Sequence, residues 1–352
     1  MPISDTSALV ALDARIADAI SDERLAERRA EDPGFADDLL ASTRAVTVGA
    51  FEDEDAEAAE IAHRALYLLY AQATWSPVWA PRTNEHDPLL HQVLGILEGG
   101  FEQQLGRRSL PEEPPRDADA FCAWLQDLAL ERELVPASGM GPFLREHATL
   151  EQMREIVAQR SLFFLKEPDP WAMVIPSLQG RAKAGLIDVL LDEYGWGRYE
   201  HMHSTVYETL MQKLDLETGY DAYFERTAWQ YLAALNLQGM YARNRRLCRR
   251  MYGYIYLVES DSPRSMANYL AAWSRLGIDD PEVTHFYELH VTADEGHQQV
   301  ALEEMIRPVV AAEPDAGPEI ARGVLEGIVI HSWFSKHLVQ SFSAGRSSLR
   351  HA

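Results

Sequence analysis

The sequence is a strongly acidic chain of 352 residues, in which 55 Asp and Glu outnumber 32 Lys and Arg and give a formal net charge of −23 at pH 7. Nucleic acids and anionic membranes are themselves polyanions, so this charge argues against both as partners. The hydrophobic fraction of 47% is ordinary for a globular protein. The N-terminus has no basic signal-peptide segment, no apolar run is long enough to span a membrane, and the two cysteines form no CxxC pair. We therefore expect a cytoplasmic protein.

Helical periodicity dominates the chain. In the stretch 54–74, apolar residues recur at three- and four-residue spacing, as on an amphipathic helix. The period-two alternation between hairpin turns that indicates strands is scarce. The sequence therefore predicts an all-α protein. The predicted helices cover 54–74, 88–105, 117–131, 149–165, 177–193, 200–214, 219–258, 263–275, 281–298 and 316–341, with connectors at 195–197, 260–263 and 277–281.

The two ends of the chain differ in composition. The first 115 residues are more acidic and carry fewer groups suited to chemistry than the remainder. We interpret 1–115 as an auxiliary segment of N-terminal helices and 116–352 as the functional core. Amphipathic N-terminal helices often pair between copies of a chain, so we expect a homodimer.

The stretch YELHVTADEGH holds two histidines and an aspartate at helical spacing. A helix turns by about 100° per residue, so Asp294 lies about 40° and His297 about 20° from His290 around the helix axis. Two imidazoles and a carboxylate on one stripe, with no thiolate, suit a reactive iron better than a structural zinc. The alternative is that the stripe is the wet face of an amphipathic helix whose other side carries Phe286 and Tyr287.

The stretch DEYGWGRYEHMH again mixes acids with histidines, and it allows two interpretations. Glu200 and His203 form an E-x-x-H pair, which is typical of ferritin-like di-metal bundles. Glu193 and His203 would instead be about 15 Å apart on a straight helix, which is too far for one metal centre. Gly195 and Gly197 can break the helix and fold its two ends toward one site. The sequence alone does not choose between these interpretations.

Two further acids follow apolar runs. Glu259 comes after MYGYIYLV and just before SDSP, and an acid in such a setting is unusual if it is buried without a partner. The alternative is that Glu259 lies at the solvent-exposed end of a helix. Glu167 ends the run SLFFLK and precedes a proline, where a negative charge opposes the helix dipole. Both positions are candidates for a chemical role.

Taken in chain order, these acids and histidines resemble those of the haem-oxygenase-like di-iron oxidases, often called iron-containing redox enzymes. The similarity extends over about 150–350 and includes the stretches LKEPDPWAMVIPSLQGRAKAGL and GRSSLR. Members of that family fold as a compact helical bundle without haem, so the resemblance implies a haem-oxygenase-like di-iron core over 116–352. The residues that carry the resemblance are Glu167, Glu193, His203, Glu259, His290, Asp294 and His297.

The resemblance implies a non-haem centre of two iron ions with O2 as co-substrate. It implies that all seven residues bind metal, that Glu167, Glu193 and Glu259 are catalytic, and hence that Glu193 is preferred over Glu200. Family members that oxidise nitrogen tend to carry an additional carboxylate on the first core helix, and Glu167 occupies the matching position. The resemblance therefore implies N-oxygenation of a small-molecule amine, such as an amino acid or a natural-product precursor, through a peroxo-diferric intermediate.

Several alternatives stay open. An oxidase of the same fold could cleave a C–C bond or desaturate an amino or fatty acid. A ferritin-like metal-binding protein would need Glu200, and a metal-free helical module would need none of these residues. The oxygenase could use an external electron donor. Manganese could replace iron at one of its two metal sites.

Other polar side chains are expected to be structural. His63 follows Glu60 in a second E-x-x-H pair, but no partner is visible near it, so we expect it on a helix surface. Cys122 and Cys248 are expected to be buried, inert thiols. A group of arginines is expected to lie on one helix, in solvent or in ion pairs: Arg243, Arg245, Arg246, Arg249 and Arg250.

Overall fold

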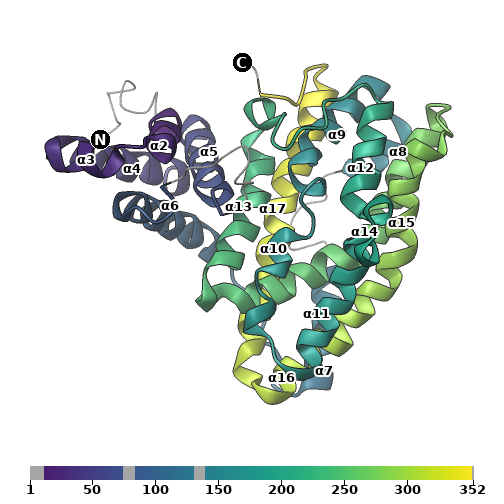
Figure 1. Cartoon of the computed structure of the whole chain (residues 1–352). Coiled ribbons are helices and arrows are strands. Elements are labelled where there is room, and N and C mark those ends of the chain that lie inside the picture. The colour runs from purple at the N-terminus through teal and green to yellow at the C-terminus, as the bar shows by residue number, and fades with distance from the viewer. Residues whose placement is uncertain (1–11, 74–83, 131–138, 351–352) are drawn as a thin grey trace. The chain divides into compact units, whose positions relative to one another are not determined.

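The computed structural model describes residues 12–73, 84–130 and 139–350, and within them every regular element is a helix and no strand occurs (Figure 1). The predicted all-α class is confirmed. Contacts divide the chain into two compact units, Met1–Ser109 and Leu110–Ala352. The division of the chain into an auxiliary segment and a di-iron core stays a prediction. No helix in the described ranges is long and apolar enough to cross a membrane.

The first unit is a set of helices whose starts are set by aspartates. The side chains of Asp32, Asp55 and Asp87 each accept a hydrogen bond from a backbone N–H in the first turn of the following helix. A proline occupies the first position of two of these helices, where its missing N–H has no cost. The helices are α2 (Leu12–Ser21), α3 (Leu25–Glu31), α4 (Pro33–Phe51), α5 (Ala56–Ala71) and α6 (Pro88–Gly106).

His63 lies inside the first unit, so its predicted surface position is wrong. Helix α5 packs against α2, α4 and α6, which leaves little of its circumference in solvent. The imidazole stands edge-on to the rings of Phe51 and Phe101, with centroid distances of 5.5 and 5.0 Å. Burial lowers the pKa of His63 to about 3, so the ring is neutral at physiological pH.

The second unit is built around one long helix, α14 (Cys248–Arg275), which packs along α15 (Pro281–Gln299) and α17 (Gly317–Ser343). Glycine lets two of these helices touch backbone to backbone, since a Cβ on Gly253 would collide with the Ile320 carbonyl. The remaining helices are α7 (Ala118–Leu130), α8 (Met140–Glu146), α9 (Leu150–Phe164), α10 (Asp169–Ala172), α11 (Gly180–Glu193), α12 (His203–Lys213), α13 (Trp229–Arg243) and α16 (Arg307–Ala312).

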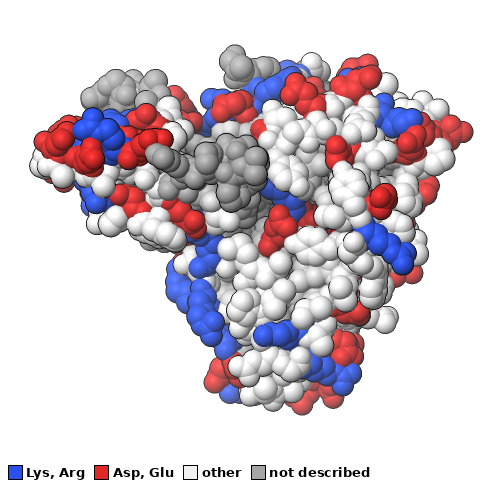
Figure 2. All heavy atoms as spheres, in the orientation of Figure 1, with Lys and Arg blue, Asp and Glu red and all other residues white. Residues whose placement is uncertain are grey.

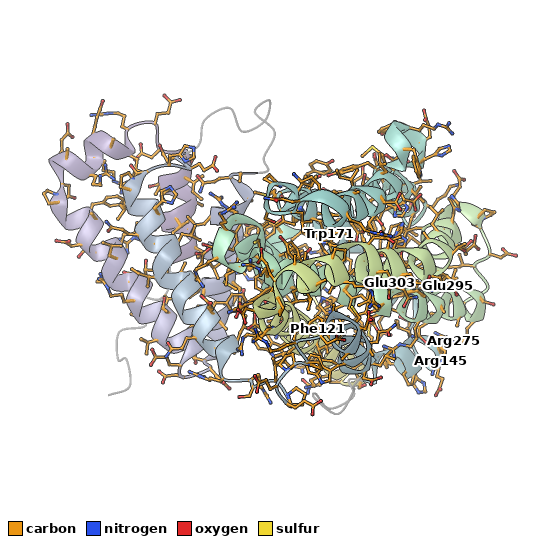
Figure 3. The ribbon with its side chains drawn as sticks, turned by 90° about the horizontal axis from the view of Figure 1, so that it is seen from below. Phe121, Arg145, Trp171, Arg275, Glu295 and Glu303 are labelled. Atoms are coloured by element: carbon orange, nitrogen blue, oxygen red, sulfur yellow. The ribbon has the colours of Figure 1, made fainter. Side chains whose placement is uncertain are left out.

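The end of α14 is tied to α8 by a side chain. Arg275 donates from Nε to the Arg145 carbonyl at 2.7 Å and from Nη2 to the Leu144 carbonyl at 3.2 Å, which satisfies carbonyls left free at the end of α8 (Figure 3). Beyond Gln299, α15 continues as a π-helix, Val300–Ile306, where the sequence predicted the helix to end. This π-helix packs on α11, and a Cβ on Gly185 would press on Glu304.

Two boundaries near α14 differ from the prediction. The connector expected at 260–263 is wrong, because α14 runs through it with Pro263 inside the helix. A proline in mid-helix leaves the carbonyl four residues earlier, that of Glu259, without its helical donor, but packing on α15 and α17 outweighs that loss. The single helix expected over 219–258 is also wrong, since α13 ends at Arg243 and a 3₁₀ turn precedes α14.

The arginine group therefore spans two helices and the turn between them. Arg250 is buried, and its guanidinium bonds Glu319 at 2.7 Å and Glu326 at 3.3 Å. Arg249 pairs with Glu313 at the surface. The expected ion pairing is confirmed for these two side chains. Acidic side chains are spread over the visible surface of both units, in keeping with the net charge of −23 (Figure 2).

Candidate metal centre

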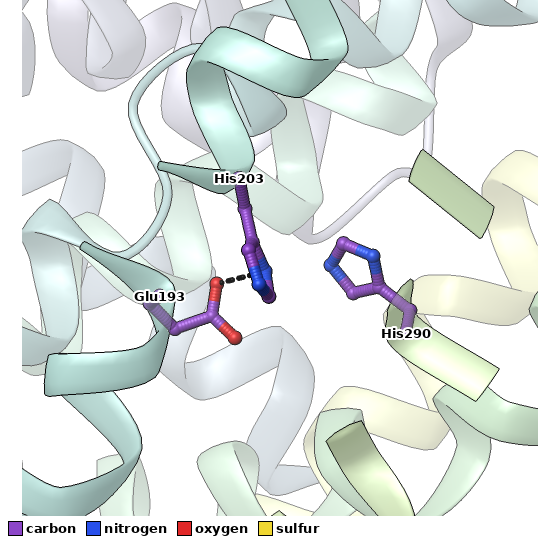
Figure 4. Close-up of side chains that lie close together, drawn as sticks. All are labelled: Glu193, His203 and His290. Atoms are coloured by element: carbon purple, nitrogen blue, oxygen red, sulfur yellow. Dashed lines mark ion pairs between the residues drawn. The ribbon is translucent and has the colours of Figure 1, made fainter. Parts of the chain in front are cut away.

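A break between α11 and α12 brings together two residues that are ten positions apart. Helix α11 ends at Glu193, α12 begins at His203, and between them Gly195 and Gly197 adopt φ values of 58° and 74°, which favour glycine. The Glu193 Oε2 and His203 Nδ1 atoms come to lie 2.8 Å apart, and both side chains are buried (Figure 4). Glu200 lies exposed in the intervening turn, so the structure places Glu193 beside His203.

Helix α15 supplies three further side chains from one face. His290, Asp294 and His297 are all buried, so the stripe faces the interior and not solvent. The His297 Nδ1 atom lies 3.2 Å from Asp294 Oδ1, 3.3 Å from Glu259 Oε2 and 3.8 Å from Glu193 Oε1. Glu259 points in from the middle of α14 and not, as predicted, from a helix end.

Glu167 completes the cluster from the segment that follows α9. Its side chain is buried, and its Oε2 atom lies 4.0 Å from His290 Nε2. All seven residues singled out in the sequence thus converge in the second unit. Two groups of three have ligand atoms within 4.8 Å of one another, and both groups contain Glu193: Glu193, His203 and His290, and Glu193, Glu259 and His297.

The cluster holds polar atoms that the protein itself leaves unsatisfied. Buried side-chain nitrogens and oxygens are nearly always hydrogen-bonded in folded proteins, so several exceptions in one place call for an explanation. A metal ion is a direct one, because it takes lone pairs that no donor uses. Six of the seven residues contribute such an atom: Glu167 Oε2, Glu193 Oε2, His203 Nδ1, His290 Nε2, Asp294 Oδ1 and His297 Nδ1. Two pairs of these atoms, Glu193 with His203 and Asp294 with His297, face each other at 2.8 and 3.2 Å without hydrogen-bond geometry.

The electrostatics of the cluster also suit cations. Burial, and then the negative charges of Glu193 and Glu259, raise the pKa of Glu167 well above its ordinary value. Burial and the charge of Asp294 do the same for the pKa of Glu259. Four carboxylates crowded in the interior repel one another, and two divalent cations would offset their combined charge of −4.

One histidine is already oriented as a ligand. His290 Nδ1 bonds the Phe286 carbonyl at 2.7 Å, which requires the proton on Nδ1 and leaves the lone pair of Nε2 facing the cluster. Burial, and then the neighbouring His203 ring, lower the pKa of His290, so it is neutral, as a metal ligand must be. The His203 and His290 ring centroids are 4.6 Å apart. Carboxylates with imidazoles are a donor set that iron accepts.

A family profile described as iron-containing redox enzyme matches residues 154–330, which is half of the chain and includes all seven cluster residues. The chain belongs to this haem-oxygenase-like family. It is also 29% identical over 214 residues to a nitrosourea synthase from Streptomyces achromogenes subsp. streptozoticus. That similarity covers 59% of this chain and 44% of the relative, so the chain spans less than half the length of that protein.

In this iron-containing redox enzyme a cavity of about 140 Å³ adjoins the cluster. Phenylalanine rings and aliphatic side chains form part of its wall, beside tyrosine hydroxyls and a glutamine amide. A cavity whose wall combines apolar surface with polar and charged side chains can bind a small molecule and orient it. Five cluster residues line it: Glu167, Glu193, Glu259, His290 and Asp294.

The sequence did not single out three other residues that line this cavity. Two of them are His331 and Tyr254, and the Tyr254 hydroxyl lies 2.9 Å from His331 Nε2. Burial, and then the positive charge of Arg160, lower the pKa of His331 to about 4, so the ring is neutral. The third is Arg160, which lies on α9, whereas Glu167 follows the end of that helix, so no helical spacing in the sequence indicated Arg160.

Proposed function

We propose that the chain is a non-haem di-iron oxygenase that uses O2 to oxidise the nitrogen of a small-molecule amine. The observation that carries the proposal is the convergence of four carboxylates and three imidazoles, six of them with an unsatisfied buried atom, beside a cavity. Membership in a family of iron-containing redox enzymes supports iron as the metal.

A count of two irons is supported by the arrangement of the ligands. The two groups of three residues share Glu193, whose two oxygens can serve one ion each. The charge of four carboxylates equals that of two ferrous ions, whereas one ion would leave an excess of negative charge in the interior.

Oxidation of nitrogen is supported by Glu167 and by the relative. Glu167 is a fourth carboxylate in the cluster and lies 4.0 Å from His290. The relative's name refers to a nitrosourea, which is a compound with an N–O bond. Conversion of an amine to a hydroxylamine with one O2 takes up two electrons and two protons and releases one water. The electrons would come from the ferrous ions and, over repeated turnovers, from an external reductant.

Iron bound by these residues would supply the activation of O2. The residues of the chain hold the geometry: the Phe286 carbonyl orients His290, and the Gly195–Gly197 turn sets His203 against Glu193. The aromatic wall of the cavity, which includes Phe163 and Phe164, keeps water away from the reacting nitrogen.

The proposal is tested by anaerobic reconstitution of the full chain with Fe²⁺, followed by exposure to isotope-labelled O2 with a panel of amino acids and amines. We expect label in a hydroxylamine, nitroso or nitro product, and a loss of at least about 10-fold in its rate in Glu167→Gln. The matched control is Glu151→Gln, an exposed glutamate on α9. Products that have lost carbon or gained a double bond, and that contain no N–O bond, would show that the reaction is C–C cleavage or desaturation and not oxidation of nitrogen.

A further inference from the structure

Among the described residues that line the cavity beside the cluster, Arg160 is the only Lys or Arg. It extends from α9, and its guanidinium carbon lies 4.8 Å from the centroid of the Phe164 ring and 5.5 Å from that of Tyr269. Its Nη1 donates to the Tyr269 hydroxyl at 2.8 Å. These contacts are all with uncharged groups, which hold the guanidinium in place without balancing its charge.

No carboxylate pairs with Arg160 among the residues that the structure describes. Ion pairs within 4.0 Å occur throughout the second unit, and Arg160 takes part in none of them. Its Nε atom is buried and has no hydrogen-bond partner. The Arg160 side chain as a whole is half-buried. A cation that is partly withdrawn from water without an ionic partner is costly, and such groups in folded proteins usually have a partner that completes them.

The cluster does not supply that partner once metal is bound. Two divalent cations offset the four cluster carboxylates, so their charge is no longer available to Arg160. Asp261 also lines the cavity, but its side chain is 42% exposed and pairs with Arg264. In the metal-bound protein Arg160 would therefore be an unbalanced, half-buried charge beside the cavity.

We propose that Arg160 binds a carboxylate of the substrate, and hence that the substrate is an amine that also carries a carboxylate, such as an amino acid. This inference rests on the proposed function, and it names the substrate class. A guanidinium binds a carboxylate through paired N–H donors, and Nε is available for one of them. One carboxylate balances one guanidinium, whereas a phosphate monoester would bring a charge of about −1.5 to −2.

The position of Arg160 allows one molecule to reach both the guanidinium and the metal ligands. The Phe164 ring centroid lies 4.8 Å from the Arg160 guanidinium carbon and 6.2 Å from the His290 ring centroid. The guanidinium carbon is thus at most about 11 Å from the His290 ring. A substrate held by its carboxylate at Arg160 can place a nitrogen toward the cluster.

The test measures binding without turnover, so that it does not depend on oxidation. The full chain is loaded with Zn²⁺ as a redox-inert stand-in, and metal content is measured first. Each proteinogenic amino acid is then compared with the amine that lacks its carboxylate, by thermal shift and by calorimetric titration. The variants are Arg160→Gln, Arg160→Lys and, as a matched control, Arg154→Gln, a more exposed arginine on the same helix.

We expect at least one amino acid to bind the wild type, and its matched amine to bind roughly 10- to 100-fold more weakly. Arg160→Gln should remove this preference, Arg160→Lys should keep part of it, and Arg154→Gln should leave it unchanged. Equal binding of acids and amines by the wild type, absence of binding by every acid, or a preference that survives in Arg160→Gln would overturn the inference. The wild-type comparison stands even if Arg160→Gln does not fold. A protein that binds acids but oxidises no nitrogen would refute the proposed function alone.

Discussion

The two units of the chain each bury histidine, and they do so in opposite ways. In the first unit His63 lies between two phenylalanine rings, and burial alone lowers its pKa. In the second unit His203, His290 and His297 are buried together with four carboxylates. Burial by itself therefore does not make a histidine a ligand. The histidines of the second unit differ from His63 because they lie beside buried carboxylates and because several polar atoms around them have no hydrogen-bond partner.

The same comparison explains why the E-x-x-H motif misleads in this chain. The motif occurs at Glu60–His63, at Glu200–His203 and, with both side chains exposed, at Glu282–His285. In the first unit it lies on a helix whose histidine is buried among rings. In the second, Glu200 is exposed, and the buried carboxylate beside His203 is Glu193. The i, i+3 spacing places two side chains on one face only when both lie on one helix, and Glu200 precedes the start of α12.

The largest effect is expected for substitution of Glu193, the residue that both groups of three share. In Glu193→Ala we expect the reconstituted chain to lose both irons, because each group loses a ligand, and activity to fall by at least about 100-fold. Iron content per chain and the rate of substrate oxidation are the measurements. A variant that keeps two irons would show that Glu193 is not a ligand.

His63 provides the opposite test in the first unit. His63→Ala should lower the free energy of unfolding by about 2 to 4 kcal/mol, because it leaves a cavity between two aromatic rings. Urea unfolding measures this loss, and iron content should stay at the wild-type value. If iron content drops while the variant remains folded, His63 has a role that its surroundings do not indicate.

Substitutions in the turn between α11 and α12 are expected to have a smaller effect on iron binding. Gly195 has φ 58°, and a Cβ there would collide with the backbone at His201 and Met202, whereas Gly197 has φ 74° but open space around it. We expect Gly195→Ala to weaken iron binding more than Gly197→Ala, whose cost is the backbone strain of about 1 to 2 kcal/mol. Competition with a chelator measures both. Equal affinities in the two variants would mean that the turn does not set the distance between Glu193 and His203.

The smallest effect is expected at Glu200. Because its side chain is exposed, Glu200→Ala should leave iron content and oxidation within about twofold of the wild type. Iron loading and turnover are measured beside Glu193→Ala. A loss of iron in Glu200→Ala alone would favour the ferritin-like alternative.

Much of the fold was predictable because helical periodicity is local. The spacing in 149–165 predicted α9 (Leu150–Phe164) to within a residue at each end. The connector expected at Pro263 was wrong, because packing of α14 on two neighbours outweighs a local breaker. The π-helix after Gln299 leaves no periodic signal of its own.

The candidate cluster was predictable for a different reason. Its ligand types are chemically distinctive, and the glycines at 195 and 197 allowed a break that could join Glu193 to His203. The choice of Glu193 over Glu200, and the full set of seven residues, came from the resemblance to the di-iron family. Arg160 was missed because an arginine on a helix is usually solvated, and only the tertiary structure shows that its Nε is buried without a partner. The unsatisfied atoms likewise depend on segments far apart in the chain.

The central claim is that the seven residues hold two irons in one centre. The most direct measurement is Mössbauer spectroscopy of the full chain reconstituted anaerobically with ⁵⁷Fe²⁺, together with iron content per chain, before and after O2. The account predicts two irons per chain that become magnetically coupled ferric ions after O2, and loss of that signal in Glu193→Ala. One uncoupled iron per chain, or a coupled pair that persists in Glu193→Ala, would contradict it.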